Sequence, residues 1–295
     1  MRVGVVVTDR GDWTAEAIGS GLSRQGAKAE YLDFSELAAL VGSDLRLLGE
    51  GRDLLGLSAL IVRDLGRRGS SDVAFRFEAL SALEESGVRV VNPPAAIARA
   101  ANKFATSVAL QRAGIPHPET LVTTSLSAAA EFVSAHGGAV YKPLFGFKGR
   151  GLRLLAPGDP SPLLELLEEG GVVYLQEFLE STAQRPRDIR AFVVGGRVAG
   201  AIFRVAPPGS WISNLARGGA PQRCPLTPEI EDLGVRAASA VGAVYCGVDL
   251  IETFSGLRVL EVNGTPSGWG LHQAWGIDVG ELIARAVLRL AGGSG

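Results

Sequence analysis

The stretch Tyr141-Lys142-Pro143-Leu144-Phe145-Gly146-Phe147-Lys148-Gly149-Arg150-Gly151 contains two lysines and three glycines, and its glycines link two apolar runs. Both runs, residues 139–144 and 152–155, have the character of β-strands. The Walker and dinucleotide motifs place their glycines at the start of a helix, so neither fits here. A glycine loop between two strands can instead fold over a triphosphate, with backbone N–H groups from the loop and the charge of Lys142. A hairpin turn with a surface lysine is the alternative.

A second group of polar residues lies near the C-terminus. Asp249 falls in one apolar strand pattern, and Glu261 and Asn263 lie two residues apart in the next. Residues two apart share a face of a strand, and a hairpin would bring Asp249 beside them. Two carboxylates and one amide oxygen suit magnesium. An exposed edge with solvated acids is the alternative interpretation.

Other segments carry weaker signals. Residues 172–180 form an apolar strand that ends in polar residues, which could bind an adenine edge through the backbone or simply leave the core. Residues 185–190 form a basic cluster, typical of a solvated loop. Arg204 differs because it stands in an apolar strand, where a guanidinium needs an anionic partner. Residues 211–219 have the length and composition of a loop that covers a site.

The order of elements predicts an α/β layer followed by an α+β region. Strand patterns at 3–8, 27–34, 59–64 and 88–91 alternate with helical patterns at 12–25 and 73–85, which predicts a Rossmann-like parallel sheet. Later strands, with hairpin signals at Gly195-Gly196 and Ser255-Gly256, predict antiparallel sheets, and residues 228–241 predict a long helix. We expect three domains: residues 1–93, 94–180 and 181–295.

Composition excludes several classes of protein. Of 295 residues, 46% are hydrophobic and 20% charged, and the net charge is -2, so disorder, nucleic-acid binding and membrane association are not expected. The first residues lack the features of a signal peptide, which predicts a cytoplasmic protein. Two cysteines without C-x-x-C spacing and three histidines do not suggest zinc. The chain has no G-x-S-x-G esterase motif, and its first strand lacks G-x-G-x-x-G.

These motifs occur together in one order that resembles the ATP-grasp superfamily, and within it the RimK-like ATP-dependent carboxylate–amine ligases. The resemblance covers residues 90–290. It rests on the motifs N-K (102–103), Y-K-P-L-F-G-x-x-G-R-G-L (141–152), L-Q-E-F (175–178), D-I-R (188–190), S-N-x-x-R-G-G (213–219), Asp249 and E-V-N-G-T-P (261–266). It implies an ATP-grasp fold in which two α+β subdomains hold ATP behind the Rossmann-like layer.

The resemblance also implies a role for each matched residue. The nucleotide site would consist of Lys103, Lys142, Gly146, Gly149, Gly151, Gln176, Glu177, Phe178, Asp188, Arg190, Ser213 and Asn214. Within it, the two lysines would contact phosphates, and residues 176–178 would hold adenine. Arg204 and Lys142 would be catalytic, with Arg204 facing the transferred phosphoryl group. Asp249, Glu261 and Asn263 would bind two Mg²⁺ or Mn²⁺ ions.

The implied reaction forms an amide through an acyl phosphate, with L-glutamate as the expected amine. A small-molecule carboxylate, such as a pterin or deazaflavin coenzyme, is the expected acceptor, and a homo-oligomer is expected from the family. Alternatives are a ligase for another amino acid (a lysine-biosynthesis carrier ligase or a D-alanine ligase), glutamylation of a ribosomal-protein tail, and a non-catalytic ATP sensor. The chain departs from the family at Ile212, where arginine is usual and where Arg217 or Lys148 could substitute, at Phe147 and at Trp275. These departures bear on the identity of the acceptor more than on the type of reaction.

Overall fold

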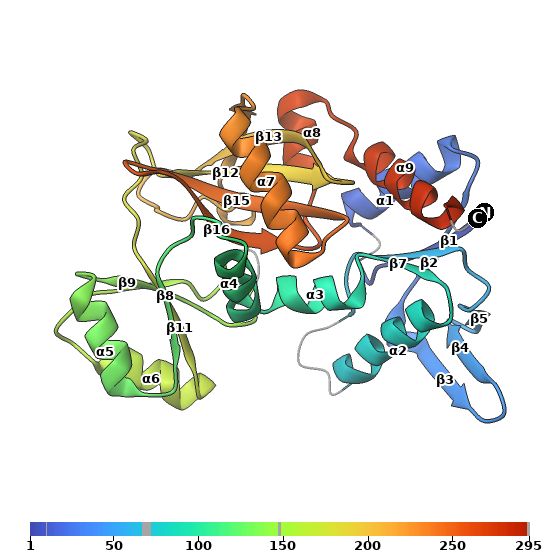
Figure 1. Cartoon of the computed structure of the whole chain (residues 1–295), viewed down its shortest axis with the longest axis horizontal. Coiled ribbons are helices and arrows are strands. Elements are labelled where there is room, and N and C mark those ends of the chain that lie inside the picture. Colours follow the sequence, from blue (N-terminus) through green and yellow to red (C-terminus); the bar gives the residue numbers. More distant parts are fainter. Residues whose placement is uncertain (10, 67–71, 147–148, 294–295) are drawn as a thin grey trace.

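The computed structural model describes residues 1–9, 11–66, 72–146 and 149–293. Its N-terminal layer, which contains β1, β2 and β7 in Figure 1, is a parallel sheet with the strand order β2-β1-β6-β7. The elements of this layer are β1 (Arg2–Val6), α1 (Trp13–Arg24), β2 (Lys28–Leu32), β6 (Ala59–Val62), α2 (Val73–Glu85) and β7 (Arg89–Val91). The predicted Rossmann-like layer is therefore confirmed. Asp12 begins α1 by accepting hydrogen bonds from the N–H groups of Thr14 and Ala15.

A small antiparallel sheet interrupts this layer where the sequence analysis assigned no strand. After a 3-10 helix, η1 (Phe34–Glu36), it consists of β3 (Leu37–Val41), β4 (Leu45–Gly49) and β5 (Arg52–Asp53). Leu40 and Val41, at the tip of the first hairpin, are 60% and 80% exposed. Because most of β3 is exposed, its apolar residues do not alternate with polar ones, and the usual strand pattern is absent.

The middle of the chain forms a second sheet, which is antiparallel and has the order β10-β9-β11-β8. Two helices, α3 (Pro94–Ala101) and α4 (Lys103–Arg112), lead into it. Its elements are β8 (Thr120–Thr123), α5 (Leu126–Ala135), β9 (Ala139–Lys142), β10 (Arg153–Leu155), α6 (Ser161–Gly170) and β11 (Val173–Glu177). Sequence patterns predict β9, β10 and β11, but no pattern was assigned to β8 or α5.

The C-terminal sheet is also antiparallel, with the order β14-β13-β12-β15-β16. Its elements, with those that follow, are β12 (Arg187–Val194), β13 (Arg197–Val205), η2 (Leu215–Arg217), β14 (Ala220–Cys224), α7 (Pro228–Val241), β15 (Tyr245–Thr253), β16 (Gly256–Asn263), α8 (Trp269–Trp275) and α9 (Val279–Gly292). The predicted hairpin at Gly195-Gly196 and the predicted helix over 228–241 are confirmed. No helix among the described residues is long and apolar enough to span a membrane.

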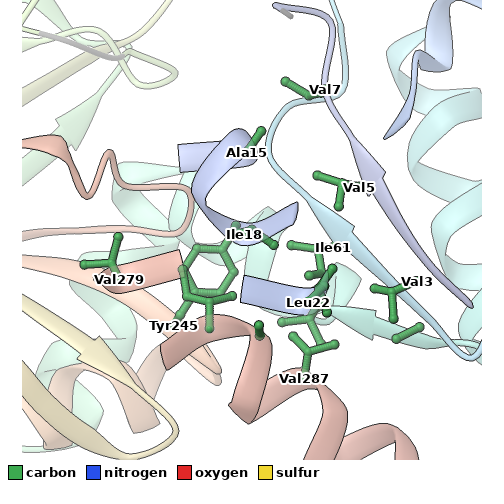
Figure 2. Packing of buried hydrophobic residues seen from close by; sticks show 14 of the residues in the cluster. Val3, Val5, Val7, Ala15, Ile18, Leu22, Ile61, Tyr245, Val279 and Val287 are labelled. Carbon is green, nitrogen blue, oxygen red and sulfur yellow. The ribbon is translucent and has the colours of Figure 1, made fainter. Parts of the chain in front are cut away.

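The largest apolar core joins the two ends of the described chain. Helix α9 packs on α1 and also reaches β6 and β7 (Figure 1). Figure 2 shows Ile18 and Leu22 of α1 beside Tyr245 of β15 and Val287 of α9, all fully buried. The division into residues 1–93, 94–180 and 181–295 stays a prediction, but α9 shares its core with the first of these segments.

Candidate active site

A buried cluster of arginines and aspartates lies on β12, β13 and β15. Asp188 pairs with Arg204 across β12 and β13, and Arg190 pairs with Asp249 across β12 and β15. Arg204 donates to both oxygens of Asp188, at 2.7 and 2.5 Å, and to Asp249 Oδ2 at 2.6 Å. Arg190 donates to both oxygens of Asp249, with Nη2 at 2.6 Å from Oδ2. Asp249 therefore bridges two guanidinium groups, and Ser213 Oγ donates to Asp188 at 2.7 Å.

The arginines keep Asp249 ionised although it is only 2% exposed. Burial alone would raise the pKa of Asp249, but Arg190 and Arg204 outweigh burial and lower that pKa to about 2. Burial likewise disfavours the charged form of Arg204, yet Asp188 and Asp249 raise the pKa of Arg204 above its ordinary value. The prediction that Arg204 needs an anionic partner is confirmed, and the chain itself supplies that partner.

The candidate metal ligands lie together on the hairpin of β15 and β16. Asp249 is opposite Glu261, and Asn263 follows two residues later on the same face. These oxygen donors are of the kind that magnesium prefers. Asn263 Oδ1 accepts a hydrogen bond from the Thr265 N–H at 3.0 Å. Within the described ranges, no group of three or more His, Cys, Asp or Glu side chains is suited to a metal. A metal site here depends on two carboxylates and one amide.

Two lysines approach this face from the central part of the chain. Lys142 ends β9, and Lys103 begins α4 and donates through Nζ to Gly146 O at 3.2 Å. Burial lowers the pKa of Lys142, Glu261 opposes that shift, and Lys103 adds to it. Charges interact strongly only within about 10 Å at 0.1 M salt. Lys142 is therefore close enough to the carboxylates of Glu261 and Asp249 for their charges to favour its charged form, and a bound anion would act in the same direction.

The glycine loop has no room for side chains at two of its glycines. Gly149 has a φ of +66° and Gly151 a φ of +72°, a conformation that favours glycine. A Cβ atom on Gly149 would lie 2.5 Å from Asn214 Oδ1, and one on Gly151 would lie 2.8 Å from Pro143 Cγ. The glycine loop thus lies directly against the loop of residues 211–219.

The 211–219 loop is where the chain departs from the family pattern. Ile212 stands in place of the usual arginine, and its Cγ2 would be 3.2 Å from a Cβ atom on Gly149. Ser213 is buried against Asp188, and Arg217, a candidate substitute for the missing cation, is exposed. Lys148, the other candidate, and Phe147 lie outside the described residues.

The residues predicted to hold adenine lie at the end of β11 and differ in exposure. Gln176 is 2% exposed, and its Nε2 donates to Tyr174 Oη at 2.8 Å and to Thr120 Oγ1 at 3.2 Å. The carboxylate of Glu177 accepts from the Glu119 N–H at 2.8 Å. The backbone N–H of Glu177 also donates to Glu119 O at 3.0 Å, so both this N–H and the side chain of Glu177 are engaged with Glu119.

Tyr174 and Trp211 belong to this region but were not among the predicted site residues. The hydroxyl of Tyr174 is 2.8 Å from Ser107 Oγ, and its pKa is raised by burial and further by Glu261. Tyr174 lies two residues before Gln176, so strand alternation could have placed both on one face. The ring of Trp211 meets exposed Phe178 edge-on, with centroids 6.4 Å apart. No sequence pattern links these two rings.

Comparison with known proteins places this geometry in a family. The model of the RimK-like ATP-grasp domain matches residues 100–287. The tetrahydromethanopterin:alpha-L-glutamate ligase of Methanosarcina acetivorans is 42% identical, over 96% of this chain and 97% of its own. The protein of the same name from Methanocaldococcus jannaschii is 35% identical, over 98% and 99%. A protein of Trichodesmium erythraeum named "Probable alpha-L-glutamate ligase" is 30% identical, over 96% and 95%.

Solved structures agree on the fold. The ATP-grasp ligase PsnB complexed with its minimal precursor, Mg and ADP is similar with a TM-score of 0.75 at 23% identity, covering 99% of this chain and 98% of PsnB. A RimK domain ATP-grasp protein from Sphaerobacter thermophilus gives a TM-score of 0.74 at 23% identity, covering 98% and 100%. The glycine loop after Lys142 at the end of β9, and the candidate metal ligands on β15 and β16 of a second antiparallel sheet, agree with the ATP-grasp fold of these structures. The chain belongs to the RimK-like ATP-grasp family.

Proposed function

We propose that this protein is an ATP-dependent carboxylate–amine ligase that adds L-glutamate to a small molecule bearing a carboxylate. The observation that carries the proposal is that Lys142 lies within the electrostatic reach of Glu261 and Asp249, two candidate metal ligands that are paired on β15 and β16, because phosphoryl transfer requires positioning and charge neutralisation. Identities of 42% and 35% over almost the whole chain favour an acceptor like that named for the two archaeal relatives, tetrahydromethanopterin. L-Glutamate is the amine named for all three relatives.

ATP would lie between the central and C-terminal sheets. Lys103 and Lys142 bind its phosphates together with backbone N–H groups of the glycine loop. The adenine meets the buried Gln176 and the backbone of residues 177 and 178. The remaining residues of the nucleotide site are Gly146, Gly149, Gly151, Asp188, Arg190, Ser213 and Asn214. Their contacts with one another support this assignment, because they join the two loops that would enclose the phosphates.

Asp249, Glu261 and Asn263 would hold two Mg²⁺ or Mn²⁺ ions. Bound ions of this kind neutralise charge on the phosphate oxygens during transfer. Asp249 Oδ2 now accepts from both Arg190 and Arg204. Arg204 binds both aspartates through Nε and Nη2, and none of these three hydrogen bonds uses Nη1, which would be the atom of Arg204 that serves the transferred phosphoryl group.

The reaction has two steps. A carboxylate oxygen of the acceptor attacks the γ-phosphorus of ATP, the bond to the bridging oxygen breaks, and ADP leaves. The uncharged amine of glutamate then attacks the acyl carbon, phosphate leaves, and the nitrogen loses a proton as the amide forms. In the first step Lys142 and Arg204 stabilise the charge on the phosphoryl oxygens.

The test is a matrix of acids and amino acids with Mg-ATP, in which ADP and product mass are measured together. We expect ADP and a product heavier by one or more glutamate residues when tetrahydromethanopterin and L-glutamate are both present. A product containing another amino acid would refute glutamate as donor. A product from another acid alone would refute the acceptor. If no ADP formed under any condition, the ligase activity would be refuted, and the non-catalytic ATP sensor would remain as the alternative. The number of glutamates added, a homo-oligomeric state and a cytoplasmic location stay predictions.

A further inference from the structure

The loop between β16 and α8, residues 264–268, is held by side chains of the N-terminal layer. Gly264 O accepts a hydrogen bond from Asn92 Nδ2 at 2.7 Å. Pro266 O accepts one from Arg63 Nη1 at 3.1 Å. Asn92 follows β7 and Arg63 follows β6, so both lie at the carboxyl end of the parallel sheet. Two carbonyl groups of this loop, two residues apart, therefore accept hydrogen bonds from side chains that follow two neighbouring strands.

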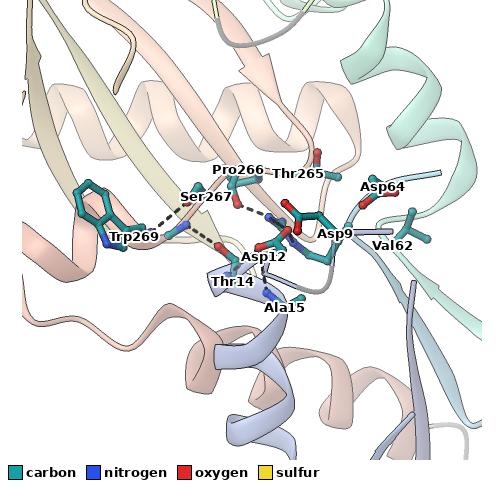
Figure 3. A network of polar contacts seen from close by, with 12 residues as sticks. Asp9, Asp12, Thr14, Ala15, Val62, Asp64, Thr265, Pro266, Ser267 and Trp269 are labelled. Carbon is teal, nitrogen blue, oxygen red and sulfur yellow. Dashed lines mark hydrogen bonds and ion pairs between the residues drawn. The ribbon is translucent and has the colours of Figure 1, made fainter. Parts of the chain in front are cut away.

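The same network reaches the start of α1. Arg63 Nε and Nη2 donate to Asp12 Oδ2 at 3.2 and 3.1 Å, while Asp12 Oδ1 caps α1. Thr14 Oγ1 accepts from the Gly268 N–H at 3.1 Å. Figure 3 shows Asp12 and Thr14 on this helix turn, close to Pro266 of the loop. Arg63 therefore joins a helix cap to the loop through one rigid guanidinium.

The two residues that hold the loop are both buried. Asn92 is 1% exposed and Arg63 is 6% exposed. Asn92 Nδ2 also donates to Tyr245 O, and its Oδ1 accepts from the N–H groups of Val244 and Tyr245 at 2.7 and 3.0 Å. The Asn92 amide uses all four of its hydrogen-bonding positions, so its orientation is determined by the backbone that surrounds it.

The loop in turn orients a candidate metal ligand. Thr265 lies between Gly264 and Pro266, whose carbonyls are both held, and its N–H donates to Asn263 Oδ1 at 3.0 Å. A continuous chain of hydrogen bonds therefore runs from the N-terminal layer to the amide oxygen of Asn263. Residues that orient metal ligands in this way commonly change metal affinity when they are altered.

We propose that Arg63 and Asn92 are positioning residues that set the amide of Asn263 for the metal, through the 264–268 loop. This inference rests on the proposed function, which assigns Asn263 to the metal. The N-terminal layer then does more than dock against the ligase sheets, because its strand ends set the geometry of a group on β16.

The first test uses Arg63→Lys, which keeps the positive charge but not the fork that joins Asp12 to Pro266. Mn²⁺ binding is titrated in the presence of AMPPNP, with free Mn²⁺ followed by electron paramagnetic resonance, and the urea midpoint reports folding. We expect Mn²⁺ affinity to fall about tenfold. Arg2→Lys is the matched control, because Arg2 donates to the Glu30 carboxylate at 2.9 and 3.1 Å at the opposite end of the same sheet. The Mn²⁺ affinity of Arg2→Lys should stay within twofold of the wild-type value.

A double-mutant cycle with Asn263→Ala separates positioning from a general structural effect. If Arg63 acts through Asn263, adding Arg63→Lys to Asn263→Ala should weaken Mn²⁺ binding little further. Effects that multiply in the double variant would overturn the inference, as would wild-type Mn²⁺ affinity in Arg63→Lys while Asn263→Ala is impaired. Unchanged affinity in Asn263→Ala would instead refute the metal role of Asn263 in the proposed function, and the inference with it. The variants that bind Mn²⁺ more weakly should also need a higher Mg²⁺ concentration for ADP formation.

Discussion

Asp249→Asn should destabilise the fold, whereas Glu261→Gln should not, although each removes one carboxylate charge from the candidate metal site. Asp249 is buried and shared by Arg190 and Arg204, so its neutral replacement leaves the half-buried Arg190 without its carboxylate partner and the buried Arg204 with Asp188 alone. Glu261 is half-buried and forms no ion pair with any residue that the structure describes. The two carboxylates therefore differ in what they contribute to folding.

The magnitude follows from the pKa of Asp249. A shift from 3.8 to about 2 corresponds to about 2 kcal/mol of stabilisation. Removing one partner of a buried ion pair typically costs about 3–5 kcal/mol. We therefore expect the free energy of unfolding to fall by about 3 kcal/mol in Asp249→Asn and by less than about 1 kcal/mol in Glu261→Gln.

The assay is urea unfolding of both variants and the wild type at neutral pH, with ADP formation measured in parallel. Both variants should lose at least about 100-fold in turnover, which corresponds to about 3 kcal/mol. The contribution of Asp249 is fully present above pH 3.8, the ordinary pKa, and is lost as the pH falls to about 2. The stability difference between Asp249→Asn and the wild type should therefore shrink over that interval. Equal urea midpoints at neutral pH would refute the ion-pair reasoning.

Three further changes test other parts of the site. Lys142→Ala should weaken ATP binding at least tenfold with an unchanged urea midpoint, because a phosphate-binding point charge is lost; unchanged affinity in a nucleotide titration would remove Lys142 from the site. Gly149→Ala should raise the KM for ATP, because a Cβ atom would meet Asn214, and an unaltered KM would show that the two loops need not touch. Arg204→Leu should abolish turnover and destabilise the fold by about 3 kcal/mol, since two buried carboxylates would lose a shared partner; a more stable variant would contradict this reading.

Sequence pattern predicts the elements whose signals are local. Gly195-Gly196 between two apolar runs is a hairpin signal, and Thr227, which caps α7, is followed by a period of apolar residues that ends at Gly242. The β3–β4 hairpin and β8 lack such signals, because β3 is mostly exposed and β8 is only half-buried. Strand β8 also depends on a partner that is distant in the sequence, because it pairs with β11.

The candidate site likewise has features that a local sequence pattern predicts and features that it does not. The spacing of Glu261 and Asn263 indicates a shared face, and the hairpin places Asp249 beside them, as the register confirms. The pairing of Asp249 with Arg190 and Arg204 depends on strand order, which a local pattern does not contain. Arg63 escaped sequence analysis for the same reason: its partners Asp12 and Pro266 are 51 and 203 residues away.

The contact between α1 and α9 has a consequence for how the chain is made. Arg24 and Glu281 pair across 257 residues of sequence, and Ile18 and Leu22 share their core with Ile283 and Val287. A ribosome adds about 5–20 residues per second, so the apolar face of α1 waits roughly 10–50 s for its partner. During that interval the N-terminal layer is exposed to aggregation and to chaperones. Variants that slow synthesis between these helices should therefore lower the yield of folded protein without altering its final stability.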